Sequence, residues 1–159
     1  YQVMTNSPTF DKQLALVEYW KQIGGTIMLP GTNRASDRFA RASFYINAIP
    51  KNDNTKQAQA SVFSVIRNAS VPYGLNTQEE PNISSTRWRT VADHKQMLYF
   101  FESALSPNVF WVDLKKINFK DGKTRRLDLG PDQSHIYAGD ATSSFKIAKP
   151  FVFLGPTTR

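Results

Sequence analysis

The chain has 159 residues, of which 40% are hydrophobic and 13% aromatic, so we expect one sizeable core in a single domain or a large piece of one. It contains no cysteine, which excludes disulfides, thiolate metal sites and a cysteine nucleophile within this chain. No apolar stretch approaches the roughly 20 residues that span a bilayer, and the first residues lack the layout of a secretory signal. The two histidines, His94 and His135, are isolated, and we expect no metal or other cofactor.

The formal net charge of +7 raises the question of an anionic partner. The basic residues are spread along the chain, which is typical of a solvated surface, and we therefore expect no nucleic-acid partner. An alternative interpretation is a non-catalytic basic module, or an isolated fragment, that contacts an anionic partner through Arg87, Arg89, Lys115 and Lys116.

Capping signals predict a first helix after a short N-terminal strand. Ser7 or Thr9 is expected to cap it, Pro8 to occupy its first turn, and Gly24 to end it. Its apolar residues recur at positions 16, 17, 20 and 23, which gives the helix one buried face.

Two further helices are expected between residues 36 and 69. Ser36 is expected to cap the second helix and Pro50 to stop it. The third helix is expected to run from Asn54 to about Ala69, because its apolar residues recur at intervals of three and four.

Aromatic and β-branched residues then arrive in short runs that predict strands. In chain order the expected strands are 86–93, 97–102, 108–114, 117–119 and 124–129. Asp93 and His94 are expected at a hairpin corner, and Asp121-Gly122 is expected to join the last two strands as a hairpin.

Helices followed by strands indicate an α+β fold in which helices pack on an antiparallel sheet. We expect a helical part at about 8–70, a strand meander at about 86–129 and an irregular tail at 130–159, all within one domain over 1–159. Trp20, Trp88 and Trp111 are expected in the core.

Several ordered motifs resemble the choloylglycine hydrolase family, which includes conjugated bile salt hydrolases and penicillin V acylases. The first is the run Val-Met-Thr-Asn-Ser-Pro-Thr-Phe-Asp at 3–11, continued by Gln13 and Leu14. The others are Leu-Pro-Gly at 29–31 with Asp37-Arg38-Phe39 after it, Thr-Arg-Trp at 86–88, and the strand-like run at 108–114.

The resemblance implies an N-terminal nucleophile hydrolase with a four-layer αββα fold. In such enzymes an N-terminal cysteine attacks a linear amide, and its own α-amino group serves as base. This chain then corresponds to the C-terminal half, and its partner is the N-terminal half that carries the cysteine. Without that half we expect the chain to be inactive. We expect the complete protein to act on a small amide of the penicillin V or conjugated bile salt type, as a homo-oligomer in the bacterial cytoplasm or periplasm.

Asn6 and Arg38 match two catalytic residues of the family. An asparagine amide can hold an α-amine or a developing oxyanion without titrating, and a guanidinium near a thiol favours the thiolate. Taken alone, Asn6 is also explained as a turn or cap residue, and Arg38 as a surface residue paired with Asp37 or Asp11. A cation near a helix N-terminus opposes the helix dipole, so another interaction should offset that cost. We expect Arg41 to make structural contacts.

Two departures favour the penicillin acylase side of the family. Ser7 stands where bile salt hydrolases commonly have a second asparagine, and the segment 24–36 is short. If the chain is half of a shared core, the faces that carry Phe39 and Ile46, and Trp88 and Thr90, should be only partly covered.

Overall fold

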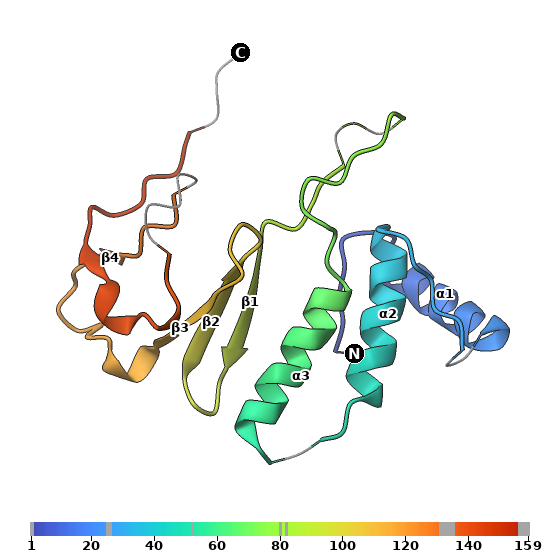
Figure 1. Ribbon diagram of the computed structural model, residues 1–159, viewed down its shortest axis with the longest axis horizontal. Coiled ribbons are helices and arrows are strands. Elements are labelled where there is room, and N and C mark those ends of the chain that lie inside the picture. Colours follow the sequence, from blue (N-terminus) through green and yellow to red (C-terminus); the bar gives the residue numbers. More distant parts are fainter. Residues whose placement is uncertain are drawn as a thin grey trace. The chain divides into compact units, whose positions relative to one another are not determined.

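A computed structural model describes residues 2–24, 27–51, 53–79, 81, 83–130 and 136–155 (Figure 1). His135, named above, lies outside the described residues, as do parts of the expected tail. The chain divides into two compact units, Tyr1–Val91 and Ala92–Arg159, and each is described by itself. Within the described residues, no helix is both long and apolar enough to cross a membrane.

The first unit contains the three predicted helices, α1 (Phe10–Ile23), α2 (Ala35–Ala48) and α3 (Thr55–Asn68). Helix α1 packs on α2, and α2 packs on α3. The third helix was expected to start at Asn54, and in the structure Asn54 caps it: its side chain accepts hydrogen bonds from the backbone N–H groups of Lys56 and Gln57, at 3.1 and 3.2 Å.

Three local expectations at the helix starts are wrong. The residues before Asn6 that the structure describes form no strand. Pro8 precedes the N-cap residue Thr9 instead of lying in the first turn of α1. Helix α2 begins one residue before Ser36, which therefore lies inside the helix and does not cap it. The N-cap position is that of Arg34, whose backbone N–H donates to the Thr32 hydroxyl at 3.2 Å.

The core of the first unit lies between α1 and α2. Val17, Phe39 and Ala40 form its buried centre. The partly buried hydrophobic residues packed against this centre are Val3, Leu14 and Trp20. Phe39 is fully buried, so the expectation that its face is only partly covered is wrong for this residue.

Four strands form one sheet, in the order β1, β2, β3, β5. Their bounds are β1 (Trp88–Asp93), β2 (Leu98–Ser103), β3 (Val109–Asp113) and β5 (Gly139–Asp140). Strands β2 and β3 are antiparallel, with Phe100 opposite Trp111, as the meander predicts. The sheet is nevertheless mixed, because β5 comes from the expected irregular tail and pairs in parallel with β3.

The expected corner and hairpin have different outcomes. The carboxylate of Asp93 accepts a bond from the backbone N–H of Gln96 at 2.8 Å, which confirms the corner. Residues 117–119 are not a strand; β4 (Arg125–Arg126) pairs instead with β6 (Lys146–Ile147). The predicted hairpin is therefore wrong, although Gly122 does occupy a turn with φ at +63°.

The second unit has its own small core. Phe110, Val112 and Ala141 are buried, and six partly buried hydrophobic residues surround them: Phe101, Leu114, Ile117, Leu127, Tyr137 and Phe145. Two short 3-10 helices, Leu114–Lys116 and Thr142–Ser144, follow β3 and β5. The parallel pairing of β5 therefore gives β3 a second neighbour that the sequence pattern did not predict.

Many large apolar side chains are exposed. Trp88 is 60% exposed, so its expected place in the core is wrong for this chain. Four consecutive residues near the C-terminus, Phe151, Val152, Phe153 and Leu154, are each at least 78% exposed. The predicted partial covering is thus found at Trp88, although not at Phe39.

Candidate functional site

Asn6 lies in a bend between the N-terminus and α1, with its side chain exposed to solvent. The following peptide, Ser7–Pro8, is cis. Among the described residues, the side chain of Asn6 has no hydrogen-bond partner, so its two N–H donors and its carbonyl oxygen are available to a ligand. Asn6 is not the residue that caps α1, because that position belongs to Thr9.

The bend is held by Gln13 of α1, a residue that the sequence argument quoted within the first motif but gave no role. Its side-chain amide donates to the backbone carbonyl oxygens of Thr5 and Pro8, at 3.5 and 2.6 Å. Its carbonyl oxygen accepts a bond from the Thr5 hydroxyl, at 2.6 Å. Two signals were available: Gln13 belongs to the first motif, and its spacing places it on the buried face with Val17.

Arg38 lies in the fourth position of α2, and its side chain is half-buried. Its Nε donates to the backbone carbonyl oxygen of Asn33, just before the helix, at 3.1 Å. This bond is the offsetting interaction that the sequence argument required. Within the described part of the chain, the guanidinium makes no ion pair with Asp37 or Asp11, and its terminal nitrogens keep their donors for another partner.

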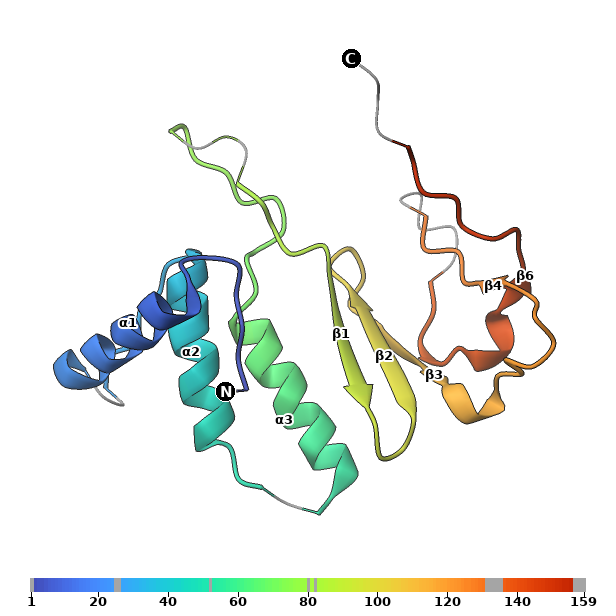
Figure 2. The same ribbon diagram turned by 180° about the vertical axis from the view of Figure 1, so that it is seen from behind.

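The two motifs meet through the core, although no hydrogen bond joins Asn6 to Arg38 within the described residues. Val3, which precedes Asn6, packs against the cluster that contains Phe39, which follows Arg38. The ring of Phe10 meets that of Phe39 edge to face, with centroids 6.3 Å apart. Figures 1 and 2 show the segment before α1 passing the end at which α2 begins.

Arg41 fixes the loop that leads into α2. Its Nη1 donates to the carbonyl oxygens of Pro30 and Thr32, at 2.7 and 2.9 Å, which confirms its expected structural role. The Thr32 hydroxyl in turn donates to Asp37 at 2.6 Å. A hollow of about 340 Å³ lies beside this loop, lined by Thr32 and Asn33 of the loop and by Arg41 of α2.

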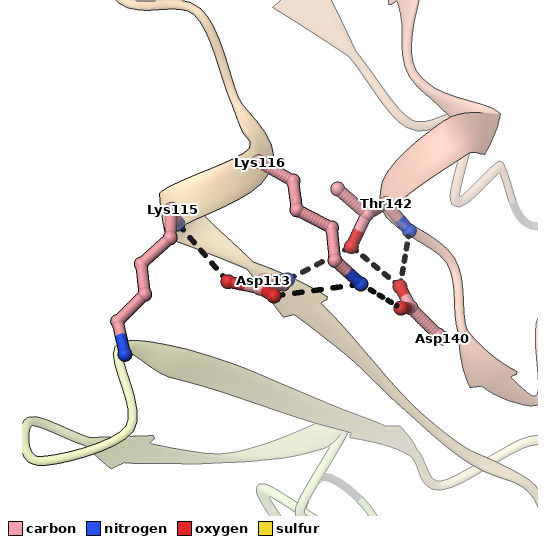
Figure 3. Close-up of polar contacts among 5 residues, drawn as sticks. All are labelled: Asp113, Lys115, Lys116, Asp140 and Thr142. Carbon is pink, nitrogen blue, oxygen red and sulfur yellow. Dashed lines mark hydrogen bonds and ion pairs between the residues drawn. The ribbon is translucent and has the colours of Figure 1, made fainter.

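The polar cluster at the end of β3 has a structural explanation (Figure 3). The ammonium group of Lys116 lies 3.5 Å from Asp113 and 3.0 Å from Asp140. The Thr142 hydroxyl accepts a bond from the backbone N–H of Asp113, at 2.8 Å, and donates to Asp140. These bonds join β3 and the residue Lys116 after it to Asp140 of β5 and to Thr142 after β5. They therefore reinforce the parallel pairing of β3 with β5.

Hydrogen bonds from Thr142, together with Lys116, lower the pKa of Asp140 from 3.8 to about 2. The same contact with Asp140 raises the pKa of Lys116 above its usual range. In the described part of the chain, no group of three or more His, Asp or Glu residues could hold a metal ion.

The residues of the basic alternative are largely engaged within the chain. Arg89 donates to the Ser70 hydroxyl at 2.7 Å, and Arg87 lies over the ring of Tyr73, 5.2 Å from its centroid. Lys116 pairs with two carboxylates. These contacts leave the basic module without a specific observation in its favour.

Comparisons with known proteins agree with the motifs. The family model of linear amide C–N hydrolases, choloylglycine hydrolase family, matches residues 1–130. A penicillin V acylase from Pectobacterium atrosepticum is 60% identical over 98% of this chain and 45% of its own length. The structure of penicillin V acylase from Agrobacterium tumefaciens superposes with a TM-score of 0.87 at 68% identity, over 98% of this chain and 50% of that one.

A mutant conjugated bile acid hydrolase from Clostridium perfringens superposes with a TM-score of 0.59 at 23% identity, over 72% of this chain and 41% of that one, and shares the fold. The predicted α+β class, as part of an N-terminal nucleophile hydrolase fold, is therefore confirmed. The chain spans about half the length of the penicillin V acylases it matches.

Proposed function

Because the chain belongs to the choloylglycine hydrolase family of linear amide C–N hydrolases, we propose that the complete protein hydrolyses the side-chain amide of penicillin V or a similar acylated amine. The observation that carries this proposal is the 60% identity to a penicillin V acylase over 98% of the chain. The conjugated bile acid hydrolase is only 23% identical and supports no substrate assignment.

The nucleophile in this proposal is an N-terminal cysteine in a second half of the protein. This chain has no cysteine and spans about half the length of its relatives. The exposed run from Phe151 to Leu154 and the 60% exposed Trp88 are apolar surfaces that a second half would cover. By itself the chain should be inactive.

Asn6 would stabilise charge at the reacting carbonyl. As the thiolate attacks, the carbonyl oxygen becomes an oxyanion, and an N–H of the Asn6 amide can donate to it. The amide oxygen can accept an N–H of the α-amino group and so orient it; the α-amino group takes the thiol proton as the sulfur attacks and then passes it to the leaving amine. The amide of Asn6, exposed and without a hydrogen-bond partner among the described residues, supports this role.

Arg38 would act on the thiol itself. A guanidinium close to a cysteine lowers the pKa of the thiol, and so raises the fraction of thiolate at neutral pH. The bond from its Nε to Asn33 fixes the direction of the side chain, and its terminal nitrogens have no partner among the described residues, so they are available to the thiol.

The test is made on the complete enzyme, with both halves present, by measuring amine release from penicillin V. Asn6→Ala should lower kcat about 100-fold or more, as expected for the loss of one oxyanion donor. Arg38→Ala should shift the acidic limb of the kcat/KM profile to higher pH, because the thiol pKa rises when the cation is removed.

Arg38→Lys is the matched control, because it keeps the positive charge and should shift the acidic limb of the kcat/KM profile less than Arg38→Ala does. Near-normal rates in both Asn6→Ala and Arg38→Ala would remove these residues from the active site. An active enzyme that cleaves only amides unlike penicillin V would contradict the proposed substrate class.

A further inference from the structure

We propose that Gln13 is the positioning residue that holds Asn6 in its working geometry. This inference rests on the proposed role of Asn6 and goes further, because it assigns the placement of that side chain to one residue of α1. Gln13 does not reach the reacting atoms in this account; it acts through the backbone on either side of Asn6.

The contacts of Gln13 are unusual for a helical glutamine. It is only 2% exposed, whereas glutamine is mostly a surface residue. All its side-chain hydrogen bonds given above run to the segment before the helix, to Thr5 and Pro8. A side chain that merely stabilised α1 would have no need to select the two residues that bracket Asn6 and Ser7.

The geometry closes a small loop. Thr5 is held through both its hydroxyl and its carbonyl oxygen, and Pro8 through its carbonyl oxygen, at 2.6 Å. One planar amide therefore ties together the two ends of the bend that carries Asn6. The backbone N–H of Gln13 donates to the carbonyl oxygen of Thr9, at 3.0 Å, so Gln13 itself is fixed in the first turn of α1. Its side chain therefore connects the bend to a rigid helix.

This rigidity matters because the exposed amide of Asn6 must be held in one orientation if it is to donate to the oxyanion. A donor stabilises an oxyanion only when it is placed within a few tenths of an ångström of its working position, and a displacement of about 1 Å can cost about 100-fold in rate. Asn6 has no side-chain bond of its own within the described residues to supply that orientation. The hydrogen bonds of Gln13 to Thr5 and Pro8, here called the Gln13 clamp, supply this orientation by fixing the main chain on both sides of Asn6.

The test uses the complete enzyme and the variant Gln13→Met, which keeps the length of the side chain and removes its hydrogen bonds. We expect kcat to fall about 10-fold to 100-fold while KM changes less than about 2-fold, because the ground-state contacts of the substrate are untouched. In an Asn6→Ala background, Gln13→Met should cause almost no further loss, since the residue it positions is gone.

Two further variants keep the test decisive. Thr5→Val removes one bond of the same clamp from the other side and should cause a smaller loss of kcat, again only when Asn6 is present; it replaces Gln13→Met if that variant does not fold. Asn47→Leu is the matched control, because the Asn47 amide also donates to a backbone carbonyl, that of Ser43, at 2.7 Å, but in α2. It should leave kcat within about 2-fold of wild type.

The outcomes separate this inference from the proposed function. Suppose that Asn6→Ala lowers kcat. If Gln13→Met then leaves kcat unchanged, or lowers kcat by the same factor in wild type and in the Asn6→Ala background, the positioning role of Gln13 is overturned while the role of Asn6 stands. If Asn6→Ala leaves kcat unchanged, both the catalytic role of Asn6 and the positioning role of Gln13 are wrong.

Discussion

Replacing Phe39 by alanine should destabilise the protein far more than replacing its ring partner Phe10. Phe39 is completely buried, so Phe39→Ala removes a full aromatic side chain and leaves a cavity, at a cost of about 3–5 kcal/mol. Phe10 is 48% exposed, so Phe10→Ala loses about half of a transfer free energy of about 1.5–3 kcal/mol, together with the ring pair at about 0.5–1.5 kcal/mol. The expected cost there is about 2 kcal/mol.

The assay is urea unfolding of the complete protein and its variants, with the free energy of unfolding extrapolated to water. The double variant isolates the ring pair, which should appear as a coupling of about 0.5–1.5 kcal/mol. Because these rings connect the Asn6 segment to the Arg38 helix, Phe39→Ala should also lower kcat in the fraction that stays folded. If Phe10→Ala costs as much as Phe39→Ala, or if the coupling is absent, the packing argument is refuted.

Two smaller effects follow from side chains that accept hydrogen bonds. Asn54→Ala removes the cap of α3 and should cost about 1 kcal/mol in unfolding free energy, whereas Asn54→Asp, which keeps an acceptor, should cost much less; equal costs would contradict the capping role. The lowered pKa of Asp140 means that its contribution to stability is complete above about pH 4 and is lost as the pH falls through about 2. NMR titration should find this pKa raised toward 3.8 in the variant Thr142→Val, and an unchanged pKa would show that the hydroxyl is not its main cause.

Local signals predicted the helices well. The third helix, expected from Asn54 to about Ala69, is found at Thr55–Asn68, because the apolar spacing of a helix is a property of a few adjacent turns. Small errors arose at the helix starts, as at Ser36, which lies inside α2 because the helix begins at Ala35. The residue at which a helix begins depends on backbone geometry that the sequence does not specify.

Long-range pairings were predicted poorly. Strand β4 has only two residues, and nothing in its own sequence distinguishes residues 117–119 from the distant β6 as its neighbour. Strand β5 likewise joins β3 in parallel with only two residues and lies in a stretch rich in turn signals. Their pairing depends on contacts between residues far apart in the chain, such as those of Thr142 and Lys116.

The sequence by itself determined the family and the two candidate residues, because Asn6 and Arg38 stand in ordered motifs whose side-chain chemistry can be read directly. Only the tertiary structure revealed what holds them. Gln13 reads as an ordinary helical glutamine until the fold turns the preceding segment back over α1, and the Asn33 carbonyl becomes the partner of Arg38 only through the path of the loop. The chemistry of a side chain depends only on its residue type, whereas its orientation depends on backbone segments that are brought together by packing.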